Sequence, residues 1–224
     1  MLLEMSAERL IAWIPAVLIA LTFHEFAHGW VAKRLGDYTA ARAGRLTLNP
    51  IPHLDPIGTL LLFVVGFGWA KPVPVNPYNF HGDIKRGMML VSLAGPGTNL
   101  VVAIAGAVIL GVVMGTLHLT GDPHSMPAFG NFFLVRILDA VILVNLILAV
   151  FNLLPVPPLD GSKILAGLLP GRQEWLYNLE RFGILILLVL VFTGAIRALF
   201  SLVIAPVHSQ LLSLAFAIAR TTGS

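Results

Sequence analysis

The chain contains no cysteine, so it holds neither a disulfide nor a thiolate-bound metal. Charged residues are also few. Asp, Glu, Lys and Arg make up 11% of the 224 residues, against about 25% in an ordinary soluble domain. Hydrophobic residues make up 57%, and the mean hydropathy is +0.88. Because so few charges cannot cover the surface of a soluble protein of this size, we expect an integral membrane protein.

Long apolar runs follow one another along the chain. A helix needs about 20 predominantly apolar residues to cross a bilayer. Four runs have this length: 10–31, 88–117, 132–154 and 182–205. Two further runs, 57–70 and 207–219, are too short to span comfortably, so we expect them to dip into the membrane or to lie along it. Residues 1–224 are therefore expected to form a single membrane-embedded domain of the all-α polytopic class.

The basic residues are distributed unevenly between these runs. Seven of the fourteen Lys and Arg residues lie in 32–87, whereas 118–131 contains none. Basic connections stay in the cytoplasm, so we expect a multi-pass protein of the cell membrane with 32–87 on the cytoplasmic side. Both ends of 57–70 are then cytoplasmic, which predicts a re-entrant stretch. The net charge of +3 therefore reflects topology rather than nucleic-acid binding.

The first apolar run is expected to be retained in the protein. Glu4 and Glu8 stand before it, where a cleavable signal peptide carries basic residues. The run also contains two histidines and a glutamate, which are the most informative residues in the chain.

Two parts of the cytoplasmic connection are expected to be short β segments. Residues 39–47 resemble a hairpin around Gly44, and the three prolines of 71–77 (KPVPVNP) preclude a helix. Extended chain beside a membrane cavity is tolerated where a partner strand pairs with its backbone. The candidate substrate-binding residues are therefore Lys71, Val73, Val75 and Asn76.

The first run contains the pattern HEFAH, from His24 to His28. On a helix the two histidines lie one turn apart on the same face, so both reach one zinc ion, and Glu25 can act on a zinc-bound water. Counted from Lys33 at 1.5 Å per residue, His28 lies about 7 Å and His24 about 13 Å inside the membrane. Ionisable residues at such depths are rare and mark functional sites. We therefore expect metal binding rather than a structural role.

A catalytic zinc usually has three protein ligands and one water, so a third ligand is expected from elsewhere in the chain. Asp160 is the strongest candidate, because it ends the run NLLPVPPLD, whose prolines break a helix on the same side of the membrane as the histidines. Asp160 could instead cap the helix that follows it. His53 and Asp55 are further candidate ligands, since they flank the start of 57–70.

Taken together, these motifs resemble the site-2 protease family of intramembrane zinc metalloproteases. The resemblance covers nearly the whole chain and is closest to compact bacterial members without a PDZ or CBS domain. Besides HEFAH and NLLPVPPLDG, it includes LNPIPHLDPIG at 48–58, GWAKPVPVNP at 68–77 and GPGTN at 95–99.

The resemblance implies a three-helix catalytic core and a hydrolytic activity. The core would consist of 10–31, 88–117 and 132–154, with one zinc ion bound by His24, His28 and Asp160. Zinc lowers the pKa of its water to about 7, and Glu25 would take the proton as general base. Asn152, eight residues before Asp160, is a candidate donor to the oxyanion; helix–helix hydrogen bonding is its alternative role.

The expected reaction is cleavage of peptide bonds in or near the transmembrane segments of membrane proteins. A helix shields its own peptide bonds, so a substrate must be unwound first, and 71–77 could then hold it by strand addition. The expected partners are a transmembrane protein substrate and the lipid bilayer. The substrate, the trigger for cleavage and the oligomeric state are left open.

Two alternative functions fit the same motifs. A metal transporter or sensor would bind zinc without chemistry, but a transporter needs polar residues between both faces, and here they gather on the cytoplasmic side. A catalytically silent scaffold would tolerate the loss of a ligand, yet Glu25, both histidines and Asp160 are present.

A stripe of small residues with helical spacing runs along 88–117. The stripe consists of Ser92, Gly95, Asn99, Ala103 and Gly106. Such stripes let helices approach closely and use a polar residue to bond between them. Asn99 is therefore expected to serve packing rather than catalysis.

Overall fold

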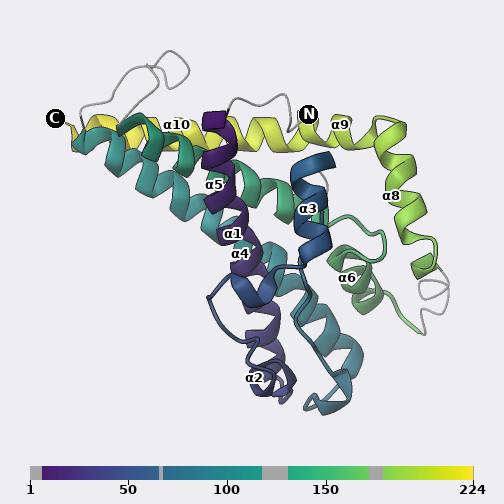
Figure 1. Ribbon diagram of the computed structural model, residues 1–224. Coiled ribbons are helices and arrows are strands. Elements are labelled where there is room, and N and C mark those ends of the chain that lie inside the picture. The colour runs from purple at the N-terminus through teal and green to yellow at the C-terminus, as the bar shows by residue number, and fades with distance from the viewer. Residues whose placement is uncertain (1–6, 66–67, 118–130, 172–178, 224) are drawn as a thin grey trace.

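A computed structural model of the chain describes residues 7–65, 68–117, 131–171 and 179–223 (Figure 1). These residues are predominantly helical and contain no β-strand, which confirms the all-α class. Within them, four helical segments are long and apolar enough to cross a membrane: Ile11–Arg34, Ile84–Thr116, Phe133–Asn152 and Ala195–Thr222. The protein is therefore a multi-pass membrane protein.

Three helices pack against one another and form the centre of the fold. They are α1 (Ala7–Arg34), α4 (Ile84–Thr116) and α5 (Asn131–Asn152), and their bounds lie within a few residues of the three expected core spans (Figure 1). Small side chains at the contacts, such as Ala20 and Ala103, are fully buried. The small-residue stripe on α4 is buried as well, so close helix packing is confirmed for it.

The connection between α1 and α4 begins differently from the expected hairpin. Residues Thr39–Arg42 form the short helix α2, and Gly44 lies in a turn with φ of 66°. The hairpin prediction was wrong because the Asp37 carboxylate accepts the backbone N–H of Thr39 at 3.0 Å, and alanines then favour a helical turn.

The stretch 57–70 leaves the connection and returns to it. After η1 (Ile51–His53), α3 (Pro56–Val65) leads away, and the chain comes back to an isolated antiparallel bridge between Leu54 and Ala70. The N–H of Lys71 donates to the carbonyl of His53 at 2.9 Å, so the two ends of the stretch meet. Such a return is compatible with the expected re-entrant stretch, which itself stays a prediction.

Residues 71–76 then run extended beside α1, before η2 (Pro77–Asn79) and the start of α4. Apart from the Leu54–Ala70 bridge, no β pairing occurs in the part of the chain that the structure describes. The β segment expected at 71–77 is thus extended chain without a ladder over 71–76, because Pro72 and Pro74 have no N–H to donate.

The C-terminal part differs from the expected single span at 182–205. Helix α8 (Gly183–Phe192) is followed by Thr193, and Gly194 then lies in the left-handed region with φ of 79°. The chain is then helical again through α9 (Ala195–Leu199), the π-helical η3 (Phe200–Ile204) and α10 (Ala205–Thr222). Run 207–219 is therefore not a separate short segment but part of a long helical stretch.

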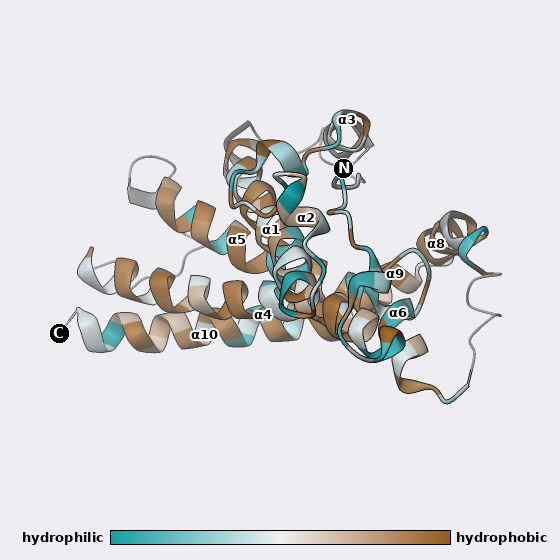
Figure 2. Ribbon diagram, turned by 90° about the horizontal axis from the view of Figure 1, so that it is seen from below, coloured by the Kyte–Doolittle hydropathy of each residue, from teal (hydrophilic) through white to brown (hydrophobic). Residues whose placement is uncertain are grey.

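Helix α10 packs along the second half of α4, where glycines allow close approach. A Cβ atom at Gly111 would lie 2.6 Å from the carbonyl oxygen of Ala215. Figure 2 shows that most of α4, α5 and α10 is hydrophobic, whereas hydrophilic residues gather around α2 and α6 (Asp160–Leu168). The hydrophilic residues thus gather at one end of the helical core, in agreement with the expectation that polar residues lie on one side of the membrane.

Candidate metal centre

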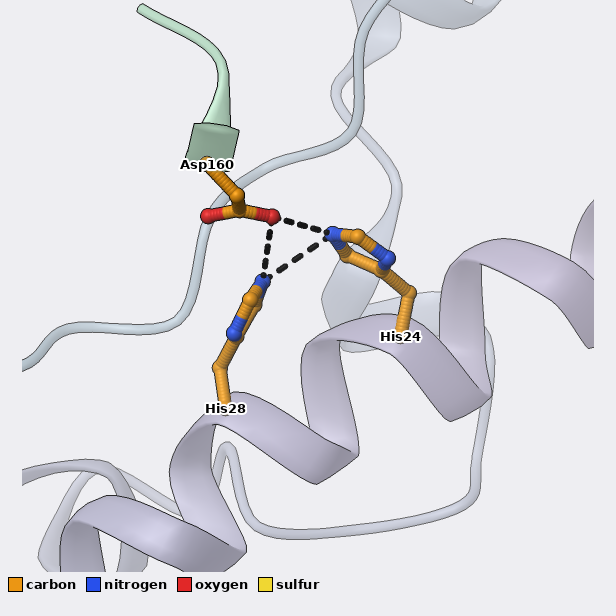
Figure 3. Close-up of side chains that lie close together, drawn as sticks. All are labelled: His24, His28 and Asp160. Carbon is orange, nitrogen blue, oxygen red and sulfur yellow. Dashed lines mark hydrogen bonds and ion pairs between the residues drawn. The ribbon is translucent and has the colours of Figure 1, made fainter. Parts of the chain in front are cut away.

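Three side chains from distant parts of the sequence point toward one another (Figure 3). Nε2 of His24 lies 3.1 Å, and Nε2 of His28 3.2 Å, from Oδ2 of Asp160. The two Nε2 atoms are 3.0 Å apart. Both histidines come from α1, and Asp160 is the first residue of α6. Among the described residues, these three form the only cluster of potential metal ligands.

The size and chemistry of this cluster fit a zinc ion. Ligand atoms at 2.0–2.1 Å in a tetrahedron are about 3.3 Å apart, close to the distances between the three atoms here. All three residues are buried, with at most 9% of each residue exposed. Two neutral imidazoles and one carboxylate are ordinary zinc ligands, and a tetrahedral ion would keep one position for water.

A chain of hydrogen bonds across three helices orients His24. Nδ1 of His24 donates to Oδ1 of Asn99 at 2.6 Å, and Nδ2 of Asn99 donates to Oδ1 of Asn145 at 2.8 Å. Nδ2 of Asn145 in turn donates to the carbonyl of Val141 at 2.8 Å. The carbonyl of Val141 can only accept, so the side-chain nitrogen of Asn145 faces it and the side-chain oxygen of Asn145 faces Asn99. The nitrogen of Asn99 therefore faces Asn145, and its oxygen faces His24. Because this oxygen also accepts, the proton of His24 is on Nδ1. The lone pair of Nε2 is therefore free for a metal.

His28 is held in the same way by the backbone of α4. Its Nδ1 donates to the carbonyl of Val91 at 2.7 Å, so its Nε2 also faces Asp160. The approach of α4 depends on Gly95, since a Cβ atom there would lie 2.6 Å from ring atoms of both histidines. The small-residue stripe thus serves the site as well as the packing.

Asp160 is placed by close contact between α6 and the end of α5. A Cβ atom at Gly161 would lie 2.3 Å from the carbonyl oxygens of Leu153 and Leu154. At the other end of α6, Nζ of Lys85 donates to the carbonyl of Leu169, which ties α6 to the start of α4.

Glu25 lies between the two histidines in sequence, and the residue is buried, with 7% exposed. Its Oε2 accepts the backbone N–H of Val73 at 2.8 Å. Of the four candidate substrate-binding residues, Val73 therefore contacts the histidine–glutamate motif directly.

The other candidates have separate roles or partners. Asp55 accepts the N–H of Gly58 at the start of α3, and buried His53 donates from Nε2 to the carbonyl of Thr47. Neither belongs to the ligand cluster. Asn152 is half-buried and donates to the carbonyl of Leu148 in its own helix. In the described part of the chain, no hydrogen bond joins Asn152 to the cluster.

Sequence reasoning missed two residues around the site and underestimated a third. Asn99 bonds helices together as expected, but it also orients His24. Asn145 was not singled out, although a fully buried amide within an apolar span indicates a polar contact. Asp37, which accepts the N–H of Asn76 at 2.7 Å, was not singled out either.

Comparison with known proteins decides the family. Residues 12–194, most of the chain, match peptidase family M50. The chain belongs to this family. This membership confirms the resemblance to site-2 proteases. The cofactor of the chain is zinc, as in the zinc metalloproteases of this family.

The curated relatives of this M50 member are named as zinc metalloproteases. It is 44% identical over 181 residues to "Putative zinc metalloprotease YwhC" of Bacillus subtilis, covering 80% of each chain. It is 33% identical over 191 residues to "Putative zinc metalloprotease Rip2" of Mycolicibacterium smegmatis, covering 84% of this chain and 69% of the relative. No solved structure matches. The chain is thus a membrane metalloprotease by family.

Proposed function

We propose that the chain is an intramembrane-cleaving endopeptidase, which hydrolyses peptide bonds in or near the transmembrane segments of membrane protein substrates. The observation that carries this proposal is the convergence of His24, His28 and Asp160 inside the helical core of an M50 protein. Their fixed orientation supports a pre-formed metal site, and the neighbouring carboxylate of Glu25 supports hydrolysis at that site.

In this proposal His24, His28 and Asp160 hold the zinc, and Glu25 is the general base. Bound zinc supplies Lewis acidity and a water that ionises near neutral pH. Val73 N–H holds Oε2 of Glu25, so Oε1 is left to take the proton from the attacking water and to pass it to the leaving amine.

Two further roles complete the proposed site. Asn152 is the candidate donor to the oxyanion, for which its amide would turn away from the Leu148 carbonyl. The extended segment Lys71–Asn76 is the candidate substrate-binding edge. Its support is the backbone of Val75, whose N–H has no acceptor among the described residues.

The proposed setting is the cytoplasmic membrane of a bacterium, with the site toward the cytoplasmic side. The histidines lie in the C-terminal half of α1, and Lys33 and Arg34 end that helix. Basic residues at a helix end favour the cytoplasmic side. A transmembrane substrate would therefore present its cytoplasmic half to the site.

The decisive experiment separates metal binding from chemistry. Purified wild-type protein and Glu25→Gln are placed in lipid vesicles with a designed single-span peptide that carries an Asn-Gly pair at its centre. We expect equal zinc content and loss of essentially all cleavage in Glu25→Gln, because only the base is removed. Glu180→Gln, the same change at an exposed glutamate, should cleave like the wild type.

Two outcomes would count against the proposal. Near-normal cleavage by Glu25→Gln would remove Glu25 as the base. A wild-type protein that binds zinc but cleaves no transmembrane peptide would favour a non-proteolytic metal-binding protein or transporter instead.

A further inference from the structure

The extended segment Lys71–Asn76 is fixed at both ends by hydrogen bonds. At its start, Nη2 of Arg45 donates to the carbonyl of Lys71 at 2.7 Å, and the N–H of Lys71 donates to His53. At its end, the N–H of Asn76 donates to Oδ2 of Asp37 at 2.7 Å. The segment is therefore held in place although it belongs to no sheet.

Asp37 is a fully buried carboxylate just beyond the end of α1. Besides the N–H of Asn76, it accepts the N–H of Thr39 at 3.0 Å, the hydroxyl of Thr39 at 2.5 Å and Nδ2 of Asn79 at 2.8 Å. Burial acts to raise the pKa of Asp37, but these four donors outweigh burial and hold the pKa below its usual range. Asp37 is therefore charged at neutral pH and matched to its donors.

Between its two ends the segment has a free backbone edge. Pro72 and Pro74 have no N–H, and the N–H of Val73 is taken by Glu25. Among the described residues, nothing accepts from the N–H of Val75 or donates to the carbonyls of Val73, Pro74 and Val75. An edge with spare donors and acceptors can pair with an extended peptide.

Two carboxylates, one on α1 and one just after its end, thus fix this edge on either side of Val75. Glu25, on α1, holds Val73 N–H, and Asp37, in the turn after α1, holds Asn76 N–H. Because α1 also carries both histidines, the position of Val75 relative to the metal centre depends on these two hydrogen bonds.

We propose that Asp37 is a positioning residue, which sets the register of a substrate strand on residues 73–75 and thereby selects the peptide bond that is cut. This inference rests on the proposed endopeptidase function. Without the Asp37 contact, the end of the segment can shift along α1, and a paired substrate shifts with it.

The first test maps cleavage sites in the designed single-span peptide by mass spectrometry. Asp37→Asn places an amide nitrogen among four donors and weakens the hold on Asn76. We expect about a tenfold loss at the wild-type bond, the effect of one hydrogen bond to a charged group, together with new cuts at neighbouring bonds and unchanged zinc content. Asp83→Asn is the matched control, because that residue caps α4, and it should cut at the wild-type bond alone.

A second variant breaks the same hydrogen bond from the other side. Asn76→Pro deletes the N–H donor and leaves the Asp37 carboxylate intact, so it should also spread the cleavage sites. If Asp37→Asn does not accumulate in the membrane, Asn76→Pro carries the same expectation.

The absence of native cysteine allows a test of register that needs no cleavage. Val75→Cys in a Glu25→Gln background is cross-linked by disulfide formation to peptides that carry single cysteines at successive positions. We expect cross-links to one or two adjacent positions, and to a wider range when Asp37→Asn is added.

These outcomes separate the two proposals. A folded, zinc-loaded Asp37→Asn with the wild-type cleavage site, rate and cross-links would overturn the positioning role. A single cross-link register without any cleavage by the wild type would overturn the protease proposal and leave the substrate register in place.

Discussion

The backbone N–H of Val73 lies 2.8 Å from the carboxylate of Glu25, so the proposed base and the extended segment share a hydrogen bond. Both residues are at most 8% exposed. Any movement of the segment on substrate binding therefore acts directly on Glu25. In the proposed mechanism, strand pairing and proton transfer are physically coupled.

The metal site gives the first prediction. His24→Ala, His28→Ala and Asp160→Ala should each reduce zinc from about one per chain to background, because each removes one of the three proposed ligands. Asp55→Asn should retain zinc, since Asp55 caps α3. Elemental analysis of purified protein measures this. Full zinc content in Asp160→Ala would remove that residue from the ligand set.

Asn99 gives a prediction about affinity rather than stoichiometry. Asn99→Ala removes the acceptor of His24 Nδ1, and the loss of such an outer partner typically weakens metal binding by about 10- to 100-fold. Competition with a chelator measures the change. Thr98→Ala, one residue away on α4, is the control and should bind zinc normally. Equal affinity in both variants would show that Asn99 serves packing alone.

Two glycines on the same helix provide a matched pair. Gly95→Ala places a methyl group 2.6 Å from the histidine rings, whereas nothing lies within 4 Å of a Cβ atom at Gly97. Gly95→Ala should therefore lose most zinc and cleavage, and Gly97→Ala should keep both, with about 1 kcal/mol gained in helix propensity. Zinc content and peptide cleavage are measured side by side. Two equally active variants would contradict the close packing of α4 on the histidines.

Val75 tests whether the extended segment pairs with substrate. Val75→Pro deletes the free N–H, a loss of about 1 kcal/mol or more for a partner left unpaired in a dry site. Val75→Ala keeps that N–H. Cleavage should therefore fall roughly tenfold further in Val75→Pro than in Val75→Ala, at equal zinc content. Equal rates in the two variants would indicate that the segment is only a loop.

The lowered pKa of Asp37 predicts that the stability of the folded protein depends on pH. Its pKa is lowered in the folded protein, so between the folded and unfolded pKa values the unfolded state binds more protons. Its stabilisation is complete above the unfolded pKa of about 3.9 and is lost as the pH falls through the lower folded pKa. In detergent, wild-type protein should unfold later than Asp37→Asn at pH 7, and the difference should shrink as the pH falls below about 4. A constant difference would contradict the charged state of Asp37.

Local periodicity predicted the part of the site that lies on one helix. The spacing of His24 and His28 places both on one face of α1, and the structure directs both Nε2 atoms to one point. The third ligand stayed open between Asp160, His53 and Asp55, because its choice depends on packing between distant segments. Asp160 meets the histidines only because α6 folds back on the end of α5.

Other features required the tertiary structure. Asn145 is a single amide in an apolar span, and its place beside Asn99 follows from how α4 and α5 pack. The C-terminal span was misplaced because average hydropathy does not register a helix break, although Thr193-Gly194 carries a turn signal. The hairpin at 39–47 failed because the competing contact comes from the side chain of Asp37.

The separation of the ligands along the chain has a consequence for biosynthesis. His24 and His28 emerge from the ribosome with the first helix, whereas Asp160 follows only after α4 and α5 have been made. A nascent chain that has inserted α1 alone offers two ligands and holds metal weakly. With the proposed ligand set, stable zinc uptake is therefore a late step, which requires that the three core helices have reached the membrane and assembled.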